Sequence, residues 1–337
     1  MLLPTFDYSE PENLEGALDL LAHHREDAKL LAGGTDLLVR MKKGLLKPKV
    51  LISLKSLNEL SYISEGADWI KIGARTPLAD IIVSEPVQNN ARALFQACEK
   101  VGAITIQHYR GTIGGNILQD NRCHHYNQSD FHRSGRQACH KDGGKICYAR
   151  ENADRCNSTC QSDGATALMA LGAKLVLMSK GNERTVDLDQ FYTAEGIMPH
   201  QMEPHELLKE IIIPLNNAET AYQRLAYRSA IDYPIVCAGV LLKPSHGEKD
   251  RIDEARIVVG AMGRAPLFLA QAASSLTGKN LDDTDAFEKA ANASMDSAAT
   301  FAVHNVGSTL EYRCEMVPTV VIRALKEAAQ AAKNQNG

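Results

Sequence analysis

Five of the eight cysteines lie within one short polar stretch of the chain: Cys123, Cys139, Cys147, Cys156 and Cys160. Cysteine thiolates are the ligands of iron–sulfur clusters and of structural zinc. Zinc sites usually contain pairs of cysteines two to four residues apart, and only Cys156 and Cys160 approach that spacing. The wide and uneven gaps between the first four favour an iron–sulfur cluster held by an extended loop. Structural zinc and unliganded thiols remain the alternatives.

The segment around these cysteines, residues 120–163, shows no apolar periodicity. A loop of this length inside a compact domain needs a physical reason, and a metal centre that replaces a hydrophobic core is one. Its basic side chains could offset the negative charge of a thiolate-ligated cluster or form a docking face for an acidic electron carrier. The segment contains four histidines (His124, His125, His132, His140) and seven lysines and arginines (Arg122, Arg133, Arg136, Lys141, Lys145, Arg150, Arg155).

Two glycine turns stand outside this segment, in Leu30–Asp36 (LLAGGTD) and in Thr112–Asn116 (TIGGN). Glycine lets the backbone approach an anion closely, and successive N–H groups can bind phosphate oxygens. Thr35 adds a hydroxyl, and Asp36 could cap the next helix or accept a hydrogen bond from a ribose or ribityl hydroxyl. The alternative is an ordinary strand-to-helix turn. Neither turn matches the Rossmann fingerprint or the Walker A loop.

The composition is that of a globular protein and excludes several other classes. The chain has 337 residues, 44% of them hydrophobic and 23% charged, with a formal net charge of −4. No basic field supports nucleic-acid binding. We expect neither a secretion signal, since residues 1–8 lack a basic segment followed by an apolar one, nor a membrane span, since no long run of apolar residues occurs. We therefore expect a cytoplasmic protein with neither a membrane nor a nucleic-acid partner. No convincing catalytic triad or acid–base pair stands out either.

The order of the expected elements indicates two α+β domains. Strands are expected at 29–32, 50–54, 69–74 and 173–178, and helices at 91–101 and 165–171. Residues 214–220 form a short boundary rich in asparagine. Beyond it we expect strands at 221–228, 235–242 and 255–260, followed by helices at 266–276, 283–303 and 317–332. This assigns residues 1–215 to a first domain, with residues 120–162 as an insertion, and residues 220–332 to a second.

Several motifs together resemble the FAD-binding medium subunits of the xanthine dehydrogenase family of molybdenum hydroxylases. These are LLAGGTDL at 30–37, TIGGN at 112–116, Ser162-Asp163, the pair Leu207-Leu208 followed by Ile213-Pro214, and Tyr227-Arg228. They follow the family's order over nearly the whole chain, although Thr166 replaces a usual proline. The resemblance implies an α+β fold with a two-lobed FAD-binding domain and a smaller α+β C-terminal domain.

The insertion narrows the resemblance. It is similar to the one in the β subunit of 4-hydroxybenzoyl-CoA reductase, a relative with an additional 4Fe–4S cluster. The resemblance implies that Cys123, Cys139, Cys147 and Cys156 ligate such a cluster and that Cys160 is a spare thiol.

The same resemblance implies two FAD-binding loops and four further contacts. Arg228 stands where the family usually has a lysine near the flavin, and His124 follows the first cluster ligand. The residues implied are Lys29, Leu30, Leu31, Ala32, Gly33, Gly34, Thr35 and Asp36 in the first loop; Gly111, Thr112, Ile113, Gly114, Gly115 and Asn116 in the second; and His124, Asp163, Leu208 and Arg228.

The implied function is that of an electron-transfer subunit. Its partners would be a large molybdopterin-binding subunit and a small 2Fe–2S subunit, in a heterotrimer that dimerises. Electrons would pass from ferredoxin through the 4Fe–4S cluster to FAD and then to the partner subunits, where an aromatic acyl-CoA loses a phenolic hydroxyl. The alternatives are the FAD subunit of another such hydroxylase running oxidatively, a zinc-stabilised scaffold without redox function, and a stand-alone flavin reductase.

Overall fold

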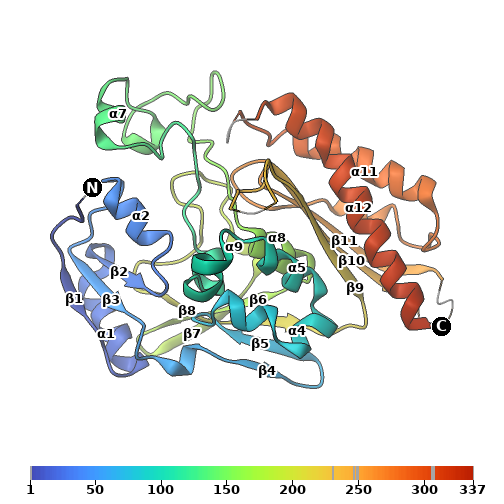
Figure 1. Ribbon diagram of the computed structural model, residues 1–337, viewed down its shortest axis with the longest axis horizontal. Coiled ribbons are helices and arrows are strands. Elements are labelled where there is room, and N and C mark those ends of the chain that lie inside the picture. Colours follow the sequence, from blue (N-terminus) through green and yellow to red (C-terminus); the bar gives the residue numbers. More distant parts are fainter. Residues whose placement is uncertain (1, 230, 246, 248–249, 305–307, 337) are drawn as a thin grey trace.

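The N-terminal lobe is a small parallel sheet in the strand order β1-β3-β2. The strands are β1 (Asp7–Ser9), β2 (Ala28–Leu31) and β3 (Val50–Ser53). Helix α1 (Leu14–His24) covers this sheet because its apolar residues recur at helical spacing and are buried against it. The computed structural model describes residues 2–229, 231–245, 247, 250–304 and 308–336 (Figure 1).

The second lobe is an antiparallel sheet of five strands in the order β4-β5-β8-β6-β7. The long segment that connects β5 to β6 contains most of the helices of this domain and the insertion. The strands are β4 (Ile63–Glu65), β5 (Trp69–Gly73), β6 (Lys174–Ser179), β7 (Asn182–Asp187) and β8 (Leu207–Pro214). The helices of the first domain beyond α1 are α2 (Leu37–Lys42), α3 (Leu78–Ile82), α4 (Glu85–Asn90), α5 (Arg92–Lys100), α6 (Ile113–Ile117), α7 (Asp130–Ser134), α8 (Asp163–Ala170) and α9 (Leu188–Phe191). Shorter turns of helix lie at Arg25–Asp27, Asn58–Leu60, Ile104–His108 and His140–Asp142.

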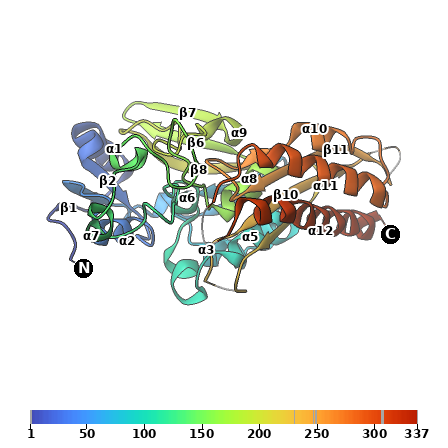
Figure 2. The same cartoon turned by 90° about the horizontal axis from the view of Figure 1, so that it is seen from above.

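The C-terminal domain is an antiparallel sheet in the order β12-β11-β10-β9, beside the long helices α11 and α12 (Figures 1 and 2). Helices α5 and α8 of the first domain also pack against this sheet. Its elements are β9 (Glu219–Leu225), β10 (Val236–Pro244), β11 (Ile252–Gly260), β12 (Leu267–Phe268), α10 (Ala270–Ser274), α11 (Thr284–Ala299) and α12 (Leu310–Asn336).

Two glycines of this sheet allow the close contact between the domains. A Cβ atom on Gly260 would lie 2.1 Å from Thr166 Oγ1, and one on Gly239 would lie 3.0 Å from the Thr166 carbonyl oxygen. Helix α8 therefore rests directly on the sheet backbone, and its N-terminal residues are fixed relative to β9 and β10.

The insertion lies outside the three sheets, and its helix α7 stands away from them in Figure 1. The two ends of the insertion meet in an antiparallel bridge between Arg122 and Thr159, with N···O distances of 2.8 and 2.7 Å. Its buried apolar core is small and consists of Cys123, Tyr126 and Ala149. This agrees with the absence of apolar periodicity in the sequence.

The expected α+β architecture is confirmed, with local differences, among them the short strands β1 and β4, which were not expected. The expected helix at 266–276 begins as strand β12 and becomes helical only at Ala270–Ser274. Strand β7 was not expected, because it is an edge strand of sequence NERTVD whose polar side chains face solvent and show no alternation of apolar residues. Among the described residues, no helix is long and apolar enough to cross a membrane.

A histidine whose ring Nε2 is buried couples this fold to pH. His200 stacks on Phe191, with ring centroids 5.3 Å apart, and burial lowers its pKa to about 4. The charged groups that act on it are Asp120, which opposes this shift, and Lys141 and Arg40, which add to it. The imidazole is therefore neutral in the folded protein at pH 5 and protonated in the unfolded chain.

Replacing His200 by phenylalanine should flatten the acid dependence of stability. The unfolded chain binds the extra proton between pH 6.5 and about 4, so the wild-type free energy of unfolding falls as pH falls, by up to about 1.4 kcal/mol per pH unit. Urea unfolding at pH 7.5 and 5.0 measures this change. The control is His23→Gln, at an exposed histidine. An equal decrease in wild type and His200→Phe would contradict the assignment.

Candidate functional site

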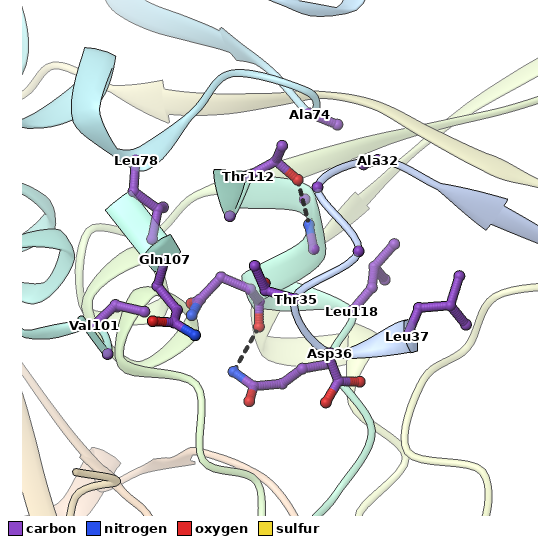
Figure 3. A pocket seen from close by; sticks show the side chains of 18 of the residues that line it. Ala32, Thr35, Asp36, Leu37, Ala74, Leu78, Val101, Gln107, Thr112 and Leu118 are labelled. Carbon is purple, nitrogen blue, oxygen red and sulfur yellow. Dashed lines mark hydrogen bonds between the residues drawn. The ribbon is translucent and has the colours of Figure 1, made fainter. Parts of the chain in front are cut away.

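The two glycine turns face one cavity of about 360 Å³ between the lobes of the first domain. The first turn lies against the backbone that leads into the second, because a Cβ atom on Gly33 would lie 1.5 Å from the Arg110 carbonyl oxygen. Gly34 has a φ of +74°, which favours glycine at that position. Figure 3 shows some of the side chains that line the cavity, among them Thr35, Asp36, Thr112 and Leu118.

The two turns differ in what their backbone N–H groups can bind. In the second turn, the N–H groups of Ile113, Gly114 and Gly115 donate to Thr76 O, Ala74 O and Thr112 Oγ1. In the first turn, the N–H groups of residues 33–36 have no acceptor among the described residues. The first turn therefore has the free donors that an anion such as a phosphate requires, and the second supplies a close packing surface.

Asp36 pairs with two arginines at the cavity and does not cap the helix that follows it. It is the N-cap residue of α2, but its side chain makes no capping hydrogen bond. Its carboxylate is 3.0 Å from the Arg122 guanidinium and 3.9 Å from that of Arg40. Arg122 also lies over the Tyr233 ring, 4.5 Å from its centroid. All four side chains line the cavity, so this charged cluster forms part of its wall.

Asp163 lies at the cavity and joins the two domains. Its Oδ1 accepts hydrogen bonds from the Tyr222 hydroxyl at 2.6 Å and from Arg224 at 3.0 Å. The side chains of Asp163 and Arg224 are each only 5% exposed. Burial raises the pKa of Asp163, and Arg224 opposes this shift. Arg224 also donates to the carbonyl oxygen of Asp232, which lines the same cavity, so the buried pair positions that wall.

Four of the residues implied by the family resemblance lie outside the cavity lining. Leu31 belongs to strand β2, and Ile113 is fully buried in the core of the second lobe. Arg228 has 68% of its side chain exposed and pairs with Asp232 at 2.7 Å. His124 lies in the insertion beyond Cys123. The residues of the set that do line the cavity are Lys29, Leu30, Ala32, Gly33, Gly34, Thr35, Asp36, Gly111, Thr112, Gly114, Gly115, Asn116, Asp163 and Leu208.

Sequence reasoning missed much of the wall, because most of these residues form no motif; Leu37 and Leu207 do belong to the quoted motifs but were not named as contacts. Gln107 lies in a single turn of π-helix, and Ile231, Asp232 and Tyr233 come from the second domain. The positive φ of Ile231, +65°, is invisible in the sequence. The other missed lining residues are Leu37, Arg40, Leu54, Leu60, Ala74, Arg75, Leu78, Val101, Gly102, Leu118, Gln119, Arg122, Gln161 and Leu207.

The four cysteines of the insertion line a second, narrow cavity together, which we call the four-cysteine cavity: Cys123, Cys139, Cys147 and Cys156. Two local structures bring them together. A tight turn connects Cys139 to Cys147: Gly143 has a φ of +83°, and Gly144 is so close to Ala138 that a Cβ atom would lie 1.8 Å from its carbonyl oxygen. The bridge between Arg122 and Thr159 brings the other two cysteines to the same side.

The thiols of this cavity lie in a polar environment. Asn157 Nδ2 lies 3.8 Å from Cys147 Sγ, and Cys156 Sγ lies 3.3 Å from Ser158 Oγ. Burial raises the pKa of Cys123, and the nearby thiols of Cys156 and Cys147 add to this shift. The eight cysteines are free. Among the described residues, no three His, Cys, Asp or Glu side chains form a group arranged to hold a single metal ion.

Cys160 does not belong to this cavity. It is buried in the apolar core of the second lobe, and burial raises its pKa to about 12. A protonated thiol in an apolar core behaves as a small hydrophobic side chain.

Comparison with known proteins decides the family. The model of the FAD binding domain in molybdopterin dehydrogenase matches residues 4–216, and the CO dehydrogenase flavoprotein C-terminal domain matches residues 221–328. The chain belongs to this family of flavoproteins. The flavoprotein is 28% identical to the carbon monoxide dehydrogenase medium chain of Afipia carboxidovorans, over 99% of this chain and all of the relative. It is 28% identical to the nicotinate dehydrogenase FAD-subunit of Eubacterium barkeri, over 82% of this chain and 81% of the relative.

Solved structures of relatives have the same fold as this flavoprotein. A chain of the reconstituted CO dehydrogenase from Oligotropha carboxidovorans superposes with a TM-score of 0.78 at 27% identity, over 98% of this chain and 99% of that one. The FAD-binding domain of the family thus corresponds to the part of the chain that supplies most of the lining of the 360 Å³ cavity.

Replacing Gly33 by alanine should weaken FAD binding at least tenfold. The new methyl group would collide with the Arg110 backbone, so the first turn must move out of its position in the cavity wall. Fluorescence titration of the flavin-free protein with FAD measures the dissociation constant. The control is Gly247→Ala, because no atom of the described residues lies within 4 Å of a Cβ placed there. Equal affinities of the two variants would show that the close approach is unimportant.

Replacing Arg224 by glutamine should both destabilise the protein and weaken FAD binding. It leaves Asp163 buried without its cationic partner, which costs about 3–5 kcal/mol in comparable buried pairs. The milder change Tyr222→Phe removes one hydrogen bond and should cost about 1–3 kcal/mol. Thermal unfolding and FAD titration of both variants measure these effects. A smaller decrease in thermal stability and in FAD affinity for Arg224→Gln than for Tyr222→Phe would refute the role given to the ion pair.

Proposed function

We propose that this chain is the FAD and 4Fe–4S electron-transfer subunit of a molybdenum hydroxylase complex. The observation that carries the proposal is that four cysteines of the insertion line one cavity, while Arg122 at the base of the insertion lines the 360 Å³ cavity. We call the 360 Å³ cavity the flavin cavity. FAD supplies one- and two-electron redox chemistry when bound, and the cluster supplies one-electron transfer.

The flavin cavity provides the contacts that a dinucleotide cofactor needs. Free N–H groups in residues 33–36 suit the pyrophosphate. The apolar residues Leu54, Leu60, Leu78 and Leu207 suit the ring systems. The remaining polar side chains of the wall, such as Gln107 and Gln119, can bind hydroxyl groups of the cofactor.

The donor set of the four-cysteine cavity fits an iron–sulfur cluster. Four thiolates complete the coordination of a cubane cluster, and the four thiols come from one loop with little apolar core of its own. The space between them is about 10 Å³, which is smaller than a cubane cluster, so the four thiols must move apart when the cluster binds. Cluster formation would then supply the ordering energy that hydrophobic burial does not provide here.

Two consecutive residues of the chain line the two cavities, one residue in each. Cys123 lines the four-cysteine cavity, and its neighbour Arg122 lines the flavin cavity. Arg122 is fixed there by its ion pair with Asp36 and its contact with the Tyr233 ring. One peptide bond therefore connects a cluster ligand to the flavin wall, which suits electron transfer between the two groups.

The insertion supports a role like that of the β subunit of 4-hydroxybenzoyl-CoA reductase, which it resembles in sequence. In such a complex, ferredoxin would reduce the cluster, and a small 2Fe–2S subunit and a large molybdopterin subunit would accept the electrons from FAD. The alternative is the reverse direction: the named relatives include nicotinate, carbon monoxide and glyceraldehyde dehydrogenases, which supports an oxidative complex that delivers electrons outward. Turnover of an aromatic acyl-CoA and of N-heterocyclic or aldehyde substrates by the native complex decides between them.

Replacing Cys147 by serine should remove the cluster and leave FAD bound, because the flavin cavity does not include this residue. Iron analysis and the visible spectrum after anaerobic purification measure both groups. The control is Cys314→Ser, whose thiol lies in the C-terminal domain on α12, and which should keep iron and flavin. Unchanged iron in the Cys147 variant, or zinc in place of iron in the wild type, would refute the cluster; parallel loss of FAD would indicate only a folding role.

A further inference from the structure

One buried cation of the insertion is not explained by the proposed function. Lys141 lines the four-cysteine cavity, and its side chain is only 6% exposed. Its ammonium lies 2.8 Å from Asp120 Oδ1 and donates to the carbonyl oxygens of Asn121 and Gly196 at 2.8 and 3.0 Å. Burying a charge is costly unless it is fully bound, so the protein holds this ammonium firmly in one place.

Asp120 continues this arrangement toward the flavin. Its side chain is 10% exposed, and its Oδ2 lies 3.2 Å from the Arg40 guanidinium. Arg40 lines the flavin cavity. A buried row of charges, Lys141, Asp120 and Arg40, thus runs from the four-cysteine cavity to the flavin cavity. Both ends of the row are positive, and Lys141 is the end that lines the four-cysteine cavity.

A fixed positive charge beside a thiolate-ligated cluster stabilises the reduced form more than the oxidised form, because the reduced form carries one more negative charge. The effect is large in a buried site, where the effective dielectric constant is low. The net charge around a cluster is one of the factors that set its reduction potential.

We propose that Lys141 is a charge-tuning residue that raises the reduction potential of the iron–sulfur cluster, and that Asp120 partly offsets it. This inference rests on the proposed function, because it requires the cluster in the four-cysteine cavity. Lys141 ligates nothing and transfers no proton in this role. It acts through its fixed charge alone.

Two substitutions that break the same ion pair separate this role from a structural one. Lys141→Gln removes the positive charge and should lower the potential, so that less than half of the cluster is reduced at the wild-type midpoint. Asp120→Asn removes the negative charge and should raise the potential, so that more than half is reduced. A merely structural ion pair predicts shifts of the same sign. The measurement is a redox titration of the anaerobically purified chain, with the reduced cluster followed by electron paramagnetic resonance.

The control is Lys145→Gln, an exposed lysine of the same loop outside the cavity lining, which should leave the potential unchanged. Opposite shifts in the Lys141 and Asp120 variants support the inference, whereas equal signs, or no shift beyond that of Lys145→Gln, overturn it. If Lys141→Gln does not retain its cluster, Asp120→Asn decides alone: a higher potential supports the inference, and an unchanged or lower one overturns it. A wild-type chain without iron overturns the proposed function itself.

Discussion

The placement of the insertion depends on the ion pair between Asp36 and Arg122. Asp36 belongs to the first glycine turn, and Arg122 is the first residue of the bridge that closes the base of the insertion. The pair is only partly exposed to solvent, with a distance of 3.0 Å, and the Tyr233 ring of the second domain covers the guanidinium. Three parts of the chain therefore meet at one arginine. The four-cysteine cavity has a defined position relative to the flavin cavity because of this contact.

A second buried pair, Asp163 with Arg224, holds the two domains together at the same cavity. The first pair joins Asp36 of the first glycine turn to Arg122, which the Tyr233 ring of the second domain covers. The second pair joins Asp163, at the N-terminus of α8, to Arg224 on strand β9 of the second domain. The cavity wall is consequently a product of both domains, and not of the first alone. This explains why Ile231 and Tyr233, which lie between β9 and β10, contribute to it.

The sequence predicted the parts of the site that depend on local chemistry. Glycine at positions 33 and 114 is required by close backbone contacts, and the four cysteines could be recognised by type and clustering. The ion pair of Asp36 with Arg122 could not be predicted, because it is set by a tertiary contact that no spacing reveals, and the exposed position of Arg228 beside Asp232 was not foreseen either. The same limit applies to strand β7, a polar edge strand, and to Lys141, whose burial depends on carbonyl oxygens from Asn121 and Gly196.

The central claim is that one chain holds both an iron–sulfur cluster and FAD. The most direct measurement is quantification of both groups in the wild-type chain after strictly anaerobic purification, by Mössbauer spectroscopy for iron and by absorbance for the released flavin. The account predicts about four irons in a cubane cluster and about one FAD per chain. FAD with no iron, or with zinc in its place, would contradict it.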